Sequence, residues 1–406
     1  MNAPPASGLD LRGARAWTLV LGIATAQLVS WGTLFYAFAV YIVPMESELG
    51  WSRPELNGAL SVGLLAAGLL SLPVGALIDR GHGRVLMTVG SVLGAVLLAA
   101  WPLARDLPLF YALWAGIGVA MAATLYEPAF AVVTFLFPRD YRRAITAVTL
   151  VGGLASTAFI PLTQFLIERL GWRDSLFVLA GFNLACALCH ALLIPPAGPL
   201  PARIARTDGR GPLTAALRRA SFWALTLSFA FNALTFTSLL FHLVPMMRER
   251  GLPMGEIVAG YAVIGPMQVA GRVLVTTIGR DLSTRAVGLI VVAAYPVALA
   301  ILMVARDFAT MVLFAVVYGL ANGVVTIIRG VIVADLYGRE GYGAIGGAMS
   351  TPATFARAGA PLAAAWAWQE LGGYGPVLWL MMAAAIVSAA AFALAMLAEA
   401  RRNGTA

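Results

Sequence analysis

Four ionisable side chains lie inside long apolar stretches of the sequence: Glu127, Arg272, Arg329 and Arg357. A charged side chain at the centre of a membrane-spanning helix costs at least about 2.5 to 3.5 kcal/mol on insertion scales. Residues of this kind bind a ligand, pair with one another or carry a proton. These four are therefore the first candidates for chemistry.

Arg272 and Arg357 indicate recognition of an anion. Each guanidinium can donate two parallel hydrogen bonds to one carboxylate, and two of them suit a mono- or dicarboxylate. At the equivalent positions of its first half the chain has Ser71 and Thr157 instead, so only its second half carries the pair. The alternative is a static structural role, although neither apolar stretch contains an acidic residue.

The elements that must position these residues are membrane-spanning helices. Of the 406 residues, 60% are hydrophobic and 11% charged, whereas an ordinary soluble domain is about 25% charged. A spanning helix needs roughly 20 mainly apolar residues. Twelve stretches meet this requirement: residues 17–43, 56–78, 85–103, 109–137, 144–167, 175–194, 221–245, 257–278, 286–305, 308–334, 344–368 and 376–397.

The loops divide the twelve stretches into two sets of six. Residues 195–220 are rich in proline, glycine and arginine, and predict a cytoplasmic linker between the bundles 1–194 and 221–406. With the N-terminus inside, 17 of the 27 arginines fall in inner loops and seven in outer loops. This bias predicts that both termini are cytoplasmic. It also explains the net charge of +8 without a nucleic-acid partner.

The two sets of six repeat each other at a nearly constant offset, close to half the length of the chain. The matched pairs include Val43 with Val244, Pro44 with Pro245, Gly50 with Gly251 and Gly171 with Gly372. Several matches in one register are hard to obtain by chance, and they predict two pseudo-symmetric bundles of six helices.

The loop between the second and third stretches is Gly75-Ala-Leu-Ile-Asp79-Arg80-Gly81-His-Gly83-Arg84. It resembles the G-x3-D-[RK] loop of the major facilitator superfamily of secondary transporters, and the likeness extends over essentially the whole chain. The resemblance implies that Asp79, Arg80 and Arg84 brace the cytoplasmic ends of neighbouring helices and help to set the equilibrium between inward and outward states. The alternative is that this loop, and the degenerate loop 278–285, only hold positive charge inside.

Within the superfamily, the chain resembles the branch of monocarboxylate porters and oxalate/formate antiporters. In that branch an arginine of span eight and a basic residue of span eleven bind the organic anion, which here implies Arg272 and Arg357. Arg142-Arg143-Ala144 at the entry to span five also resembles the branch. Monocarboxylate porters have an aspartate where this chain has Gln268, so we do not expect proton coupling through that position.

The superfamily fold implies that spans one, four, seven and ten face a central cavity. We hypothesise that Glu127 and Arg329 form a salt bridge that closes an inner gate, and that Glu127 is a candidate proton carrier. A static ion pair, or a side chain that reaches the cytoplasmic surface, is the alternative. Candidates for substrate contact, each of which also suits helix packing, are Tyr36, Tyr126, Asn232, His242 and Asn322.

Other motifs do not predict a site. Cys186-Ala-Leu-Cys189-His190 matches the haem-attachment pattern, but it lies inside the sixth stretch. Three histidines without an acidic cluster do not predict a metal site. The chain contains no lysine, which excludes a Walker-type ATP site. No serine or cysteine is placed with a histidine and an acid as nucleophilic catalysis requires, so we expect neither an enzyme nor a cofactor.

We therefore predict an all-α membrane protein with the major facilitator fold. Its expected function is secondary transport of a small organic anion across a bacterial cytoplasmic membrane, by proton symport or anion exchange and by alternating access. The expected partners are the anion, protons and lipid, the chain is expected to be a monomer, and no nucleic acid is expected. The alternatives are a proton-coupled exporter of drugs or metabolites, in which Glu127 carries the proton, and a non-transporting membrane receptor.

Overall fold

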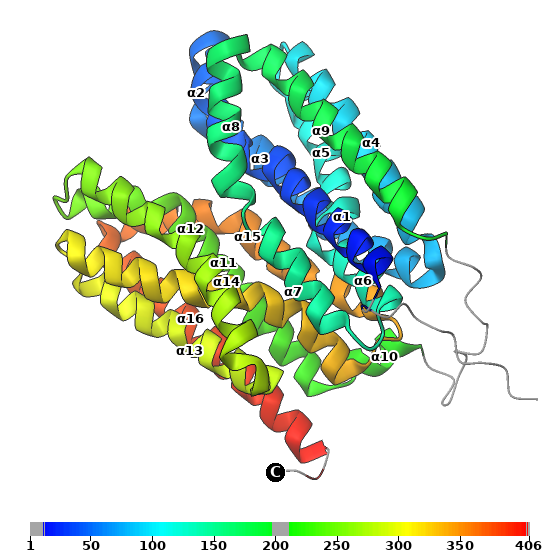
Figure 1. Cartoon of the computed structure of the whole chain (residues 1–406). Coiled ribbons are helices and arrows are strands. Elements are labelled where there is room, and N and C mark those ends of the chain that lie inside the picture. The colour runs from blue at the N-terminus through cyan, green and yellow to red at the C-terminus, as the bar shows by residue number, and fades with distance from the viewer. Residues whose placement is uncertain (1–10, 12, 197–210, 403, 405–406) are drawn as a thin grey trace, which may run out of the picture. The chain divides into compact units, whose positions relative to one another are not determined.

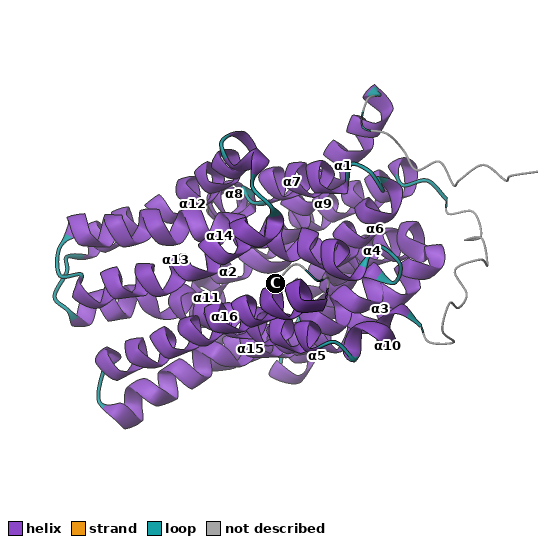
Figure 2. Ribbon diagram, turned by 90° about the horizontal axis from the view of Figure 1, so that it is seen from below, coloured by secondary structure: helices purple, strands orange, loops and turns teal. Residues whose placement is uncertain are grey.

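The computed structural model describes residues 11, 13–196, 211–402 and 404, and these described residues form helices without a β-strand (Figure 1, Figure 2). The elements in chain order are α1 (Ala14–Trp31), η1 (Gly32–Tyr36), α2 (Phe38–Leu49), α3 (Arg53–Leu77), η2 (Ile78–His82), α4 (Gly83–Ala100), η3 (Trp101–Leu103), α5 (Leu107–Thr124), α6 (Tyr126–Leu136), α7 (Tyr141–Gly152), α8 (Ala155–Leu170), α9 (Trp172–Leu193), α10 (Pro212–Leu217), α11 (Ala220–Glu249), α12 (Met254–Thr277), η4 (Gly279–Asp281), α13 (Thr284–Val304), α14 (Phe308–Tyr337), α15 (Tyr342–Leu371) and α16 (Tyr374–Arg402).

Every predicted membrane stretch corresponds to one helix or to two or three consecutive helical elements. By length and hydropathy, ten helical segments of the described residues could cross a membrane. The longest, Arg53–Leu103, holds the second and third stretches, which join at a kink where Gly81 has a φ of 90°. The eleventh stretch is α15, which is 30 residues long. The prediction of an all-α membrane protein is confirmed.

Helix ends repeat between the two sequence halves in the register of the internal repeat. Gly50 and Gly251 follow the first helical span of each half with φ of 70° and 85°, a conformation that suits glycine. Asp106 and Asp307 begin α5 and α14, and each accepts a hydrogen bond of 2.8 Å from a backbone N–H three residues later. The N–H and hydroxyl of Thr310 also hold the pKa of Asp307 below its ordinary value. These shared ends support the internal repeat.

Contacts group the chain into two compact units. Unit 1 comprises Met1–Leu213 with Val333–Ala348, and unit 2 comprises Thr214–Ile332 with Met349–Ala406. Unit 1 therefore includes the last turns of α14 and the first turns of α15, which the division into 1–194 and 221–406 does not predict. Within the predicted linker, residues 197–210 lie outside the described residues, and α10 follows them.

In unit 1, α3 packs on α5, α4 packs on α5 and α9, and α1 packs on α7 and α9 (Figure 1). Its core includes Trp101 and Trp114, whose rings are fully buried and 5.0 Å apart. In unit 2, α16 packs along both α11 and α13. Of the candidate site residues, Asn232 and His242 lie on α11.

Candidate functional site

Asp79 binds the N-terminal end of α15 within unit 1. Its two carboxylate oxygens accept hydrogen bonds from the backbone N–H groups of Gly343 and Ala344, at 2.8 and 2.7 Å. The first N–H groups of a helix have no intrahelical acceptor, and the helix dipole there favours an anion. Gly75 permits this approach because a Cβ at that position would lie 1.9 Å from the Gly343 carbonyl oxygen. The spacing of Gly75 and Asp79 thus follows from this contact, in which Gly75 allows the close approach and Asp79 accepts the hydrogen bonds.

A second carboxylate, Asp335, ties the end of α14 to the start of α7 in the same unit. Arg142 donates from Nε and Nη2 to its two oxygens, at 3.2 and 2.8 Å, and the Tyr141 hydroxyl is also hydrogen-bonded to it. Asp335 was not among the sequence candidates, because its local signal is only an acid in the last turn of an apolar helix. Arg80 is exposed and Arg84 half-buried, and their bracing role stays a prediction.

Spans one, four and five of unit 1 are each interrupted in mid-helix. The π-turn η1 separates α1 from α2, the extended residue Leu125 with ψ of −158° separates α5 from α6, and residues 153–154 separate α7 from α8. Hydropathy predicts these spans but not their breaks. Interruptions of this kind are found where membrane helices line a binding site.

The two tyrosines predicted to contact substrate lie at these interruptions. The ring of Trp31 is 6.1 Å from that of Tyr36 and 5.2 Å from that of Tyr126, and Tyr126 stacks on Phe130 at 5.1 Å. Tilted and stacked aromatic pairs at these distances stabilise the packing of the rings. The structure thus brings Tyr36 and Tyr126 together around Trp31, while their contact with substrate stays a prediction.

Gln27 satisfies a carbonyl that Pro128 leaves without its helical donor. Pro128 has no N–H, so the carbonyl of Thr124, four residues earlier, cannot receive the usual helical hydrogen bond. The fully buried Gln27 side chain donates to this carbonyl from Nε2 at 2.6 Å. Glu127, half-buried in the first turn of α6, therefore lies on a break that span one stabilises. Gln27 was not among the sequence candidates.

Arg272 is buried in unit 2, with only 3% of the residue exposed. Its Nε donates to the carbonyl oxygen of Gly323 on α14 at 3.1 Å. The helices α12 and α14 approach closely because both carry glycine at the contact. A Cβ at Gly271 would lie 2.4 Å from the carbonyl oxygen of Leu320, and one at Gly323 would lie 2.1 Å from that of Gln268. The guanidinium is thus oriented by a neutral backbone group.

The other two mid-span arginines also belong to unit 2. Arg357 is half-buried on α15, one turn before Pro361. Arg329 on α14 donates from Nη2 to the hydroxyl of Ser350 at 2.8 Å. Because Glu127 belongs to unit 1, its salt bridge with Arg329 stays a prediction.

Both predicted asparagines of unit 2 are hydrogen-bonded to one buried tyrosine. Tyr295 of α13 donates from its hydroxyl to Oδ1 of Asn322 at 2.8 Å, and its side chain is also hydrogen-bonded to Asn232 of α11. Tyr295 was not among the sequence candidates because it lies on span nine, which is not one of the spans expected at the cavity. A contact of Asn232 or Asn322 with substrate stays a prediction.

His242 of α11 is engaged through both ring nitrogens. Its Nδ1 is 2.9 Å from the hydroxyl of Tyr374, and its Nε2 is 3.0 Å from the carbonyl oxygen of Pro361. Because a carbonyl can only accept, Nε2 must carry a hydrogen. His242 therefore joins α11 to α15 and α16, and a contact with substrate stays a prediction.

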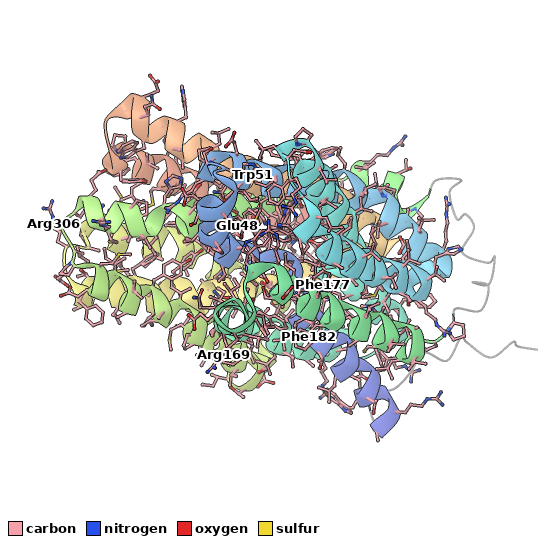
Figure 3. The ribbon with its side chains drawn as sticks, turned by 90° about the horizontal axis from the view of Figure 1, so that it is seen from above. Glu48, Trp51, Arg169, Phe177, Phe182 and Arg306 are labelled. Atoms are coloured by element: carbon pink, nitrogen blue, oxygen red, sulfur yellow. The ribbon has the colours of Figure 1, made fainter. Side chains whose placement is uncertain are left out.

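Glu48 and Glu249 occupy equivalent positions of the internal repeat. Each lies at the end of its half that is predicted to face outward. Glu48 of α2 lies beside the loop that holds Trp51 (Figure 3) and accepts hydrogen bonds from the indole of Trp172 and the guanidinium of Arg173. Glu249, at the equivalent position of the repeat, accepts from Nε1 of Trp368 at 2.8 Å and from a backbone N–H of α16 at 2.9 Å. Each carboxylate ties the first span of its half to the junction of the fifth and sixth.

The motif Cys186-Ala-Leu-Cys189-His190, which matches the haem-attachment pattern, lies on α9, a helix that packs against α1 and α4. Cys186 and Cys189 are free thiols on α9, and the ring of His190 is fully buried with Nδ1 near the hydroxyl of Ser91 at 3.1 Å. Among the described residues, no group of three or more histidine, cysteine, aspartate or glutamate side chains could hold a metal ion.

The fold and these contacts can be compared with known proteins. A family model described as Major Facilitator Superfamily matches residues 19–301, which is more than half of the sequence. The chain belongs to the major facilitator superfamily. The prediction drawn from the Asp79 loop is confirmed, and the chain is a multi-pass membrane transporter of this superfamily.

Among curated proteins, the chain is 25% identical over 335 residues to monocarboxylate transporter 13 of Rattus norvegicus, covering 80% of this chain and 76% of that protein. It is 29% identical over 196 residues to monocarboxylate transporter 11 of Homo sapiens, covering 47% of this chain and 39% of that protein. The match to the second relative therefore spans less than half of either protein.

Two solved structures share the fold over nearly the whole chain. The human organic anion transporter MFSD10 (TETRAN) has a TM-score of 0.71 at 16% identity, covering 94% of this chain and 100% of that one. A variant of the E. coli fucose:proton symporter FucP has a TM-score of 0.69 at 15% identity, covering 96% of this chain and 99% of that one. At these identities the likeness concerns the fold alone.

Proposed function

We propose that this superfamily member is a secondary transporter of a small organic anion, a mono- or dicarboxylate. It works by alternating access in a bacterial cytoplasmic membrane, with both termini in the cytoplasm, and it catalyses no covalent chemistry. The observation that carries the proposal is the buried guanidinium of Arg272, held in unit 2 by the Gly323 carbonyl.

A buried guanidinium inside a membrane helix is costly, and it favours a ligand of opposite charge. The Gly323 carbonyl orients the group by accepting the Nε hydrogen bond. A carboxylate matches the fork of the guanidinium with two parallel hydrogen bonds. A cationic substrate would be repelled, and a purely apolar one would gain nothing from the charge.

Arg357 is the second proposed anion-binding group. It belongs to the same unit as Arg272, and its guanidinium suits a second carboxylate or the other oxygen of the first. The names of the relatives support an anionic cargo, because they are monocarboxylate transporters and an organic anion transporter. Their substrates are properties of those proteins, and for this chain the class of anion rests on the two arginines.

The energy source is proposed to be a proton or anion gradient. Glu127 is the candidate proton carrier, because Gln268 occupies the position at which monocarboxylate porters have an acid. Glu127 lies on the break in span four that Gln27 supports.

The test begins with purified full-length protein and a library of organic acids. Thermal-shift screening identifies an anion that stabilises the protein, and uptake into proteoliposomes follows with and without a pH gradient. Arg272→Ala and Arg357→Ala are expected to abolish both responses. The proposal fails if no anion stabilises the protein, or if both variants transport like the wild type.

Arg250→Ala is a matched control in the same unit. Arg250 donates from Nη1 to the backbone carbonyls of Leu302 and Ala305 at the end of α13. Its removal is expected to lower the unfolding temperature and to leave the anion affinity unchanged, because the contact lies at a helix end. This variant separates loss of an anion-binding group from loss of a structural arginine.

A further inference from the structure

One buried hydroxyl joins three helices of unit 2. Tyr295 on α13 is 2% exposed, and its hydroxyl donates to Oδ1 of Asn322 on α14 at 2.8 Å. Asn232 on α11 is hydrogen-bonded to the same tyrosine. Asn322 is itself only 8% exposed. A buried polar network of this kind holds its helices in one arrangement, because each lost partner would leave a polar group desolvated.

The next residue along α14 is the one that holds Arg272. Gly323 follows Asn322 directly, and its carbonyl oxygen accepts the Nε hydrogen bond of Arg272 at 3.1 Å. Successive residues of an α-helix have a fixed geometric relation. A side-chain bond that fixes Asn322 against α13 therefore also fixes the direction of the neighbouring carbonyl.

The packing at Gly323 makes Arg272 sensitive to small movements of α14. A Cβ at Gly323 would lie 2.1 Å from the carbonyl oxygen of Gln268 on α12, so the two backbones are in direct contact there. Gln268 lies one helical turn before Arg272 on the same helix. A shift or rotation of α14 would thus alter both the contact of the helices and the anchor of the guanidinium.

We propose that Tyr295 is a positioning residue of the anion site, acting through Asn322 and Gly323 on the orientation of the Arg272 guanidinium. This inference rests on the proposed function, in which Arg272 binds the carboxylate. In this arrangement Asn322 acts on the substrate through Arg272, and Tyr295 acts from α13 without touching the anion.

The test uses Tyr295→Phe, which removes the hydroxyl and keeps the ring. The full-length protein is titrated with pyruvate, oxalate and succinate, and Kd is measured by thermal shift and by calorimetry. Loss of one such hydrogen bond corresponds to a change of about 2- to 12-fold. We expect Kd to rise within that range, and KM for uptake to rise with it, while kcat changes less.

Tyr41→Phe is the matched control. Tyr41 is fully buried in unit 1, and its hydroxyl lies 2.8 Å from that of Ser175. The same atom is removed from a similar environment in the unit that lacks Arg272. Both variants are expected to lower the unfolding temperature, but only Tyr295→Phe is expected to weaken anion binding.

A second pair of variants tests the coupling of Gly323 to Arg272 without removing a buried polar group. Gly323→Ala is expected to separate α12 from α14 and to raise Kd, whereas Gly255→Ala on α12, where a Cβ would meet nothing within 4 Å, is expected to leave it unchanged. If Tyr295→Phe is too unstable to purify, Tyr295→Phe with Asn322→Leu removes both members of the 2.8 Å hydrogen bond and is expected to recover part of the stability but not the affinity.

The outcomes separate the inference from the proposed function. Equal anion affinity in Tyr295→Phe and Tyr41→Phe, with binding lost in Arg272→Ala, overturns the positioning role and leaves the proposed function standing. Unchanged binding in Arg272→Ala, or no binding of any acid of the organic-acid library to the wild type, overturns the proposed function and the inference with it. Weakened binding in Tyr295→Phe and Gly323→Ala, but in neither control, supports the positioning role.

Discussion

Replacing Arg272 with lysine separates the geometry of the guanidinium from its charge. Lysine keeps the positive charge but has no N–H where Arg272 Nε donates to Gly323, and its ammonium cannot form the planar two-pronged contact with a carboxylate. One of two parallel bonds to the anion is then lost, and a hydrogen bond to a charged group contributes about 1.5 to 3 kcal/mol. Since about 1.4 kcal/mol is tenfold in affinity, Arg272→Lys is expected to raise Kd roughly 10- to 150-fold.

Arg250→Lys is the control for this prediction. Arg250 reaches both of its backbone carbonyl partners through the single nitrogen Nη1, so a lysine ammonium can take over the contact. Kd is measured by titrated thermal shift with pyruvate, oxalate and succinate for both variants. A Kd for Arg272→Lys within threefold of the wild type would show that charge alone suffices, and would refute the reasoning from the Gly323 anchor.

Three further predictions concern residues outside the proposed anion site. Gln27→Leu is expected to lower the free energy of unfolding by about 1 to 3 kcal/mol, because the buried Thr124 carbonyl loses its donor. Thermal unfolding is compared with that of the surface variant Gln164→Leu. Equal midpoints of the two variants would contradict the prediction. Asp79→Asn is expected to speed hydrogen–deuterium exchange of the amides of Gly343 and Ala344, which donate to the carboxylate, whereas Arg80→Gln should not. Glu127→Gln is expected to abolish the effect of a pH gradient on uptake while anion exchange persists, and an unchanged pH response in proteoliposomes would exclude Glu127 as the proton carrier.

The position of the long apolar helices could be predicted from the sequence because a bilayer leaves the backbone few choices. Within lipid every N–H and C=O must be satisfied inside the segment, so an apolar stretch of sufficient length becomes a helix. The interruptions at η1 and Leu125 could not be predicted in the same way. Hydropathy is averaged over the length of a whole span and does not register a break. The donor that stabilises the break at Thr124 is Gln27, which belongs to a different span.

Some functional candidates can be recognised from their own stretch of sequence, whereas others depend on contacts with distant helices. A charge in an apolar stretch, as at Arg272, is visible locally, and so is the spacing of Gly75 and Asp79. Tyr295 and Asp335 were missed, because a tyrosine in an apolar helix and an acid near a helix end are both ordinary. Their roles follow from partners that the fold brings from other helices, such as Arg142 for Asp335 and Asn322 for Tyr295.

The internal repeat is retained at the helix ends and lost at the proposed anion site, and packing explains the difference. Gly50 and Gly251 share their left-handed conformation at equivalent positions of the repeat. The residue equivalent to Arg272 is Ser71, which is 9% exposed and donates back to the carbonyl of Ala67 at 2.9 Å. Its own carbonyl would lie 2.3 Å from a Cβ at Gly347, so α3 touches the backbone of α15 at this level. A guanidinium at this position would have to displace that contact, and we therefore expect Ser71→Arg to disrupt unit 1 rather than to create a second anion site.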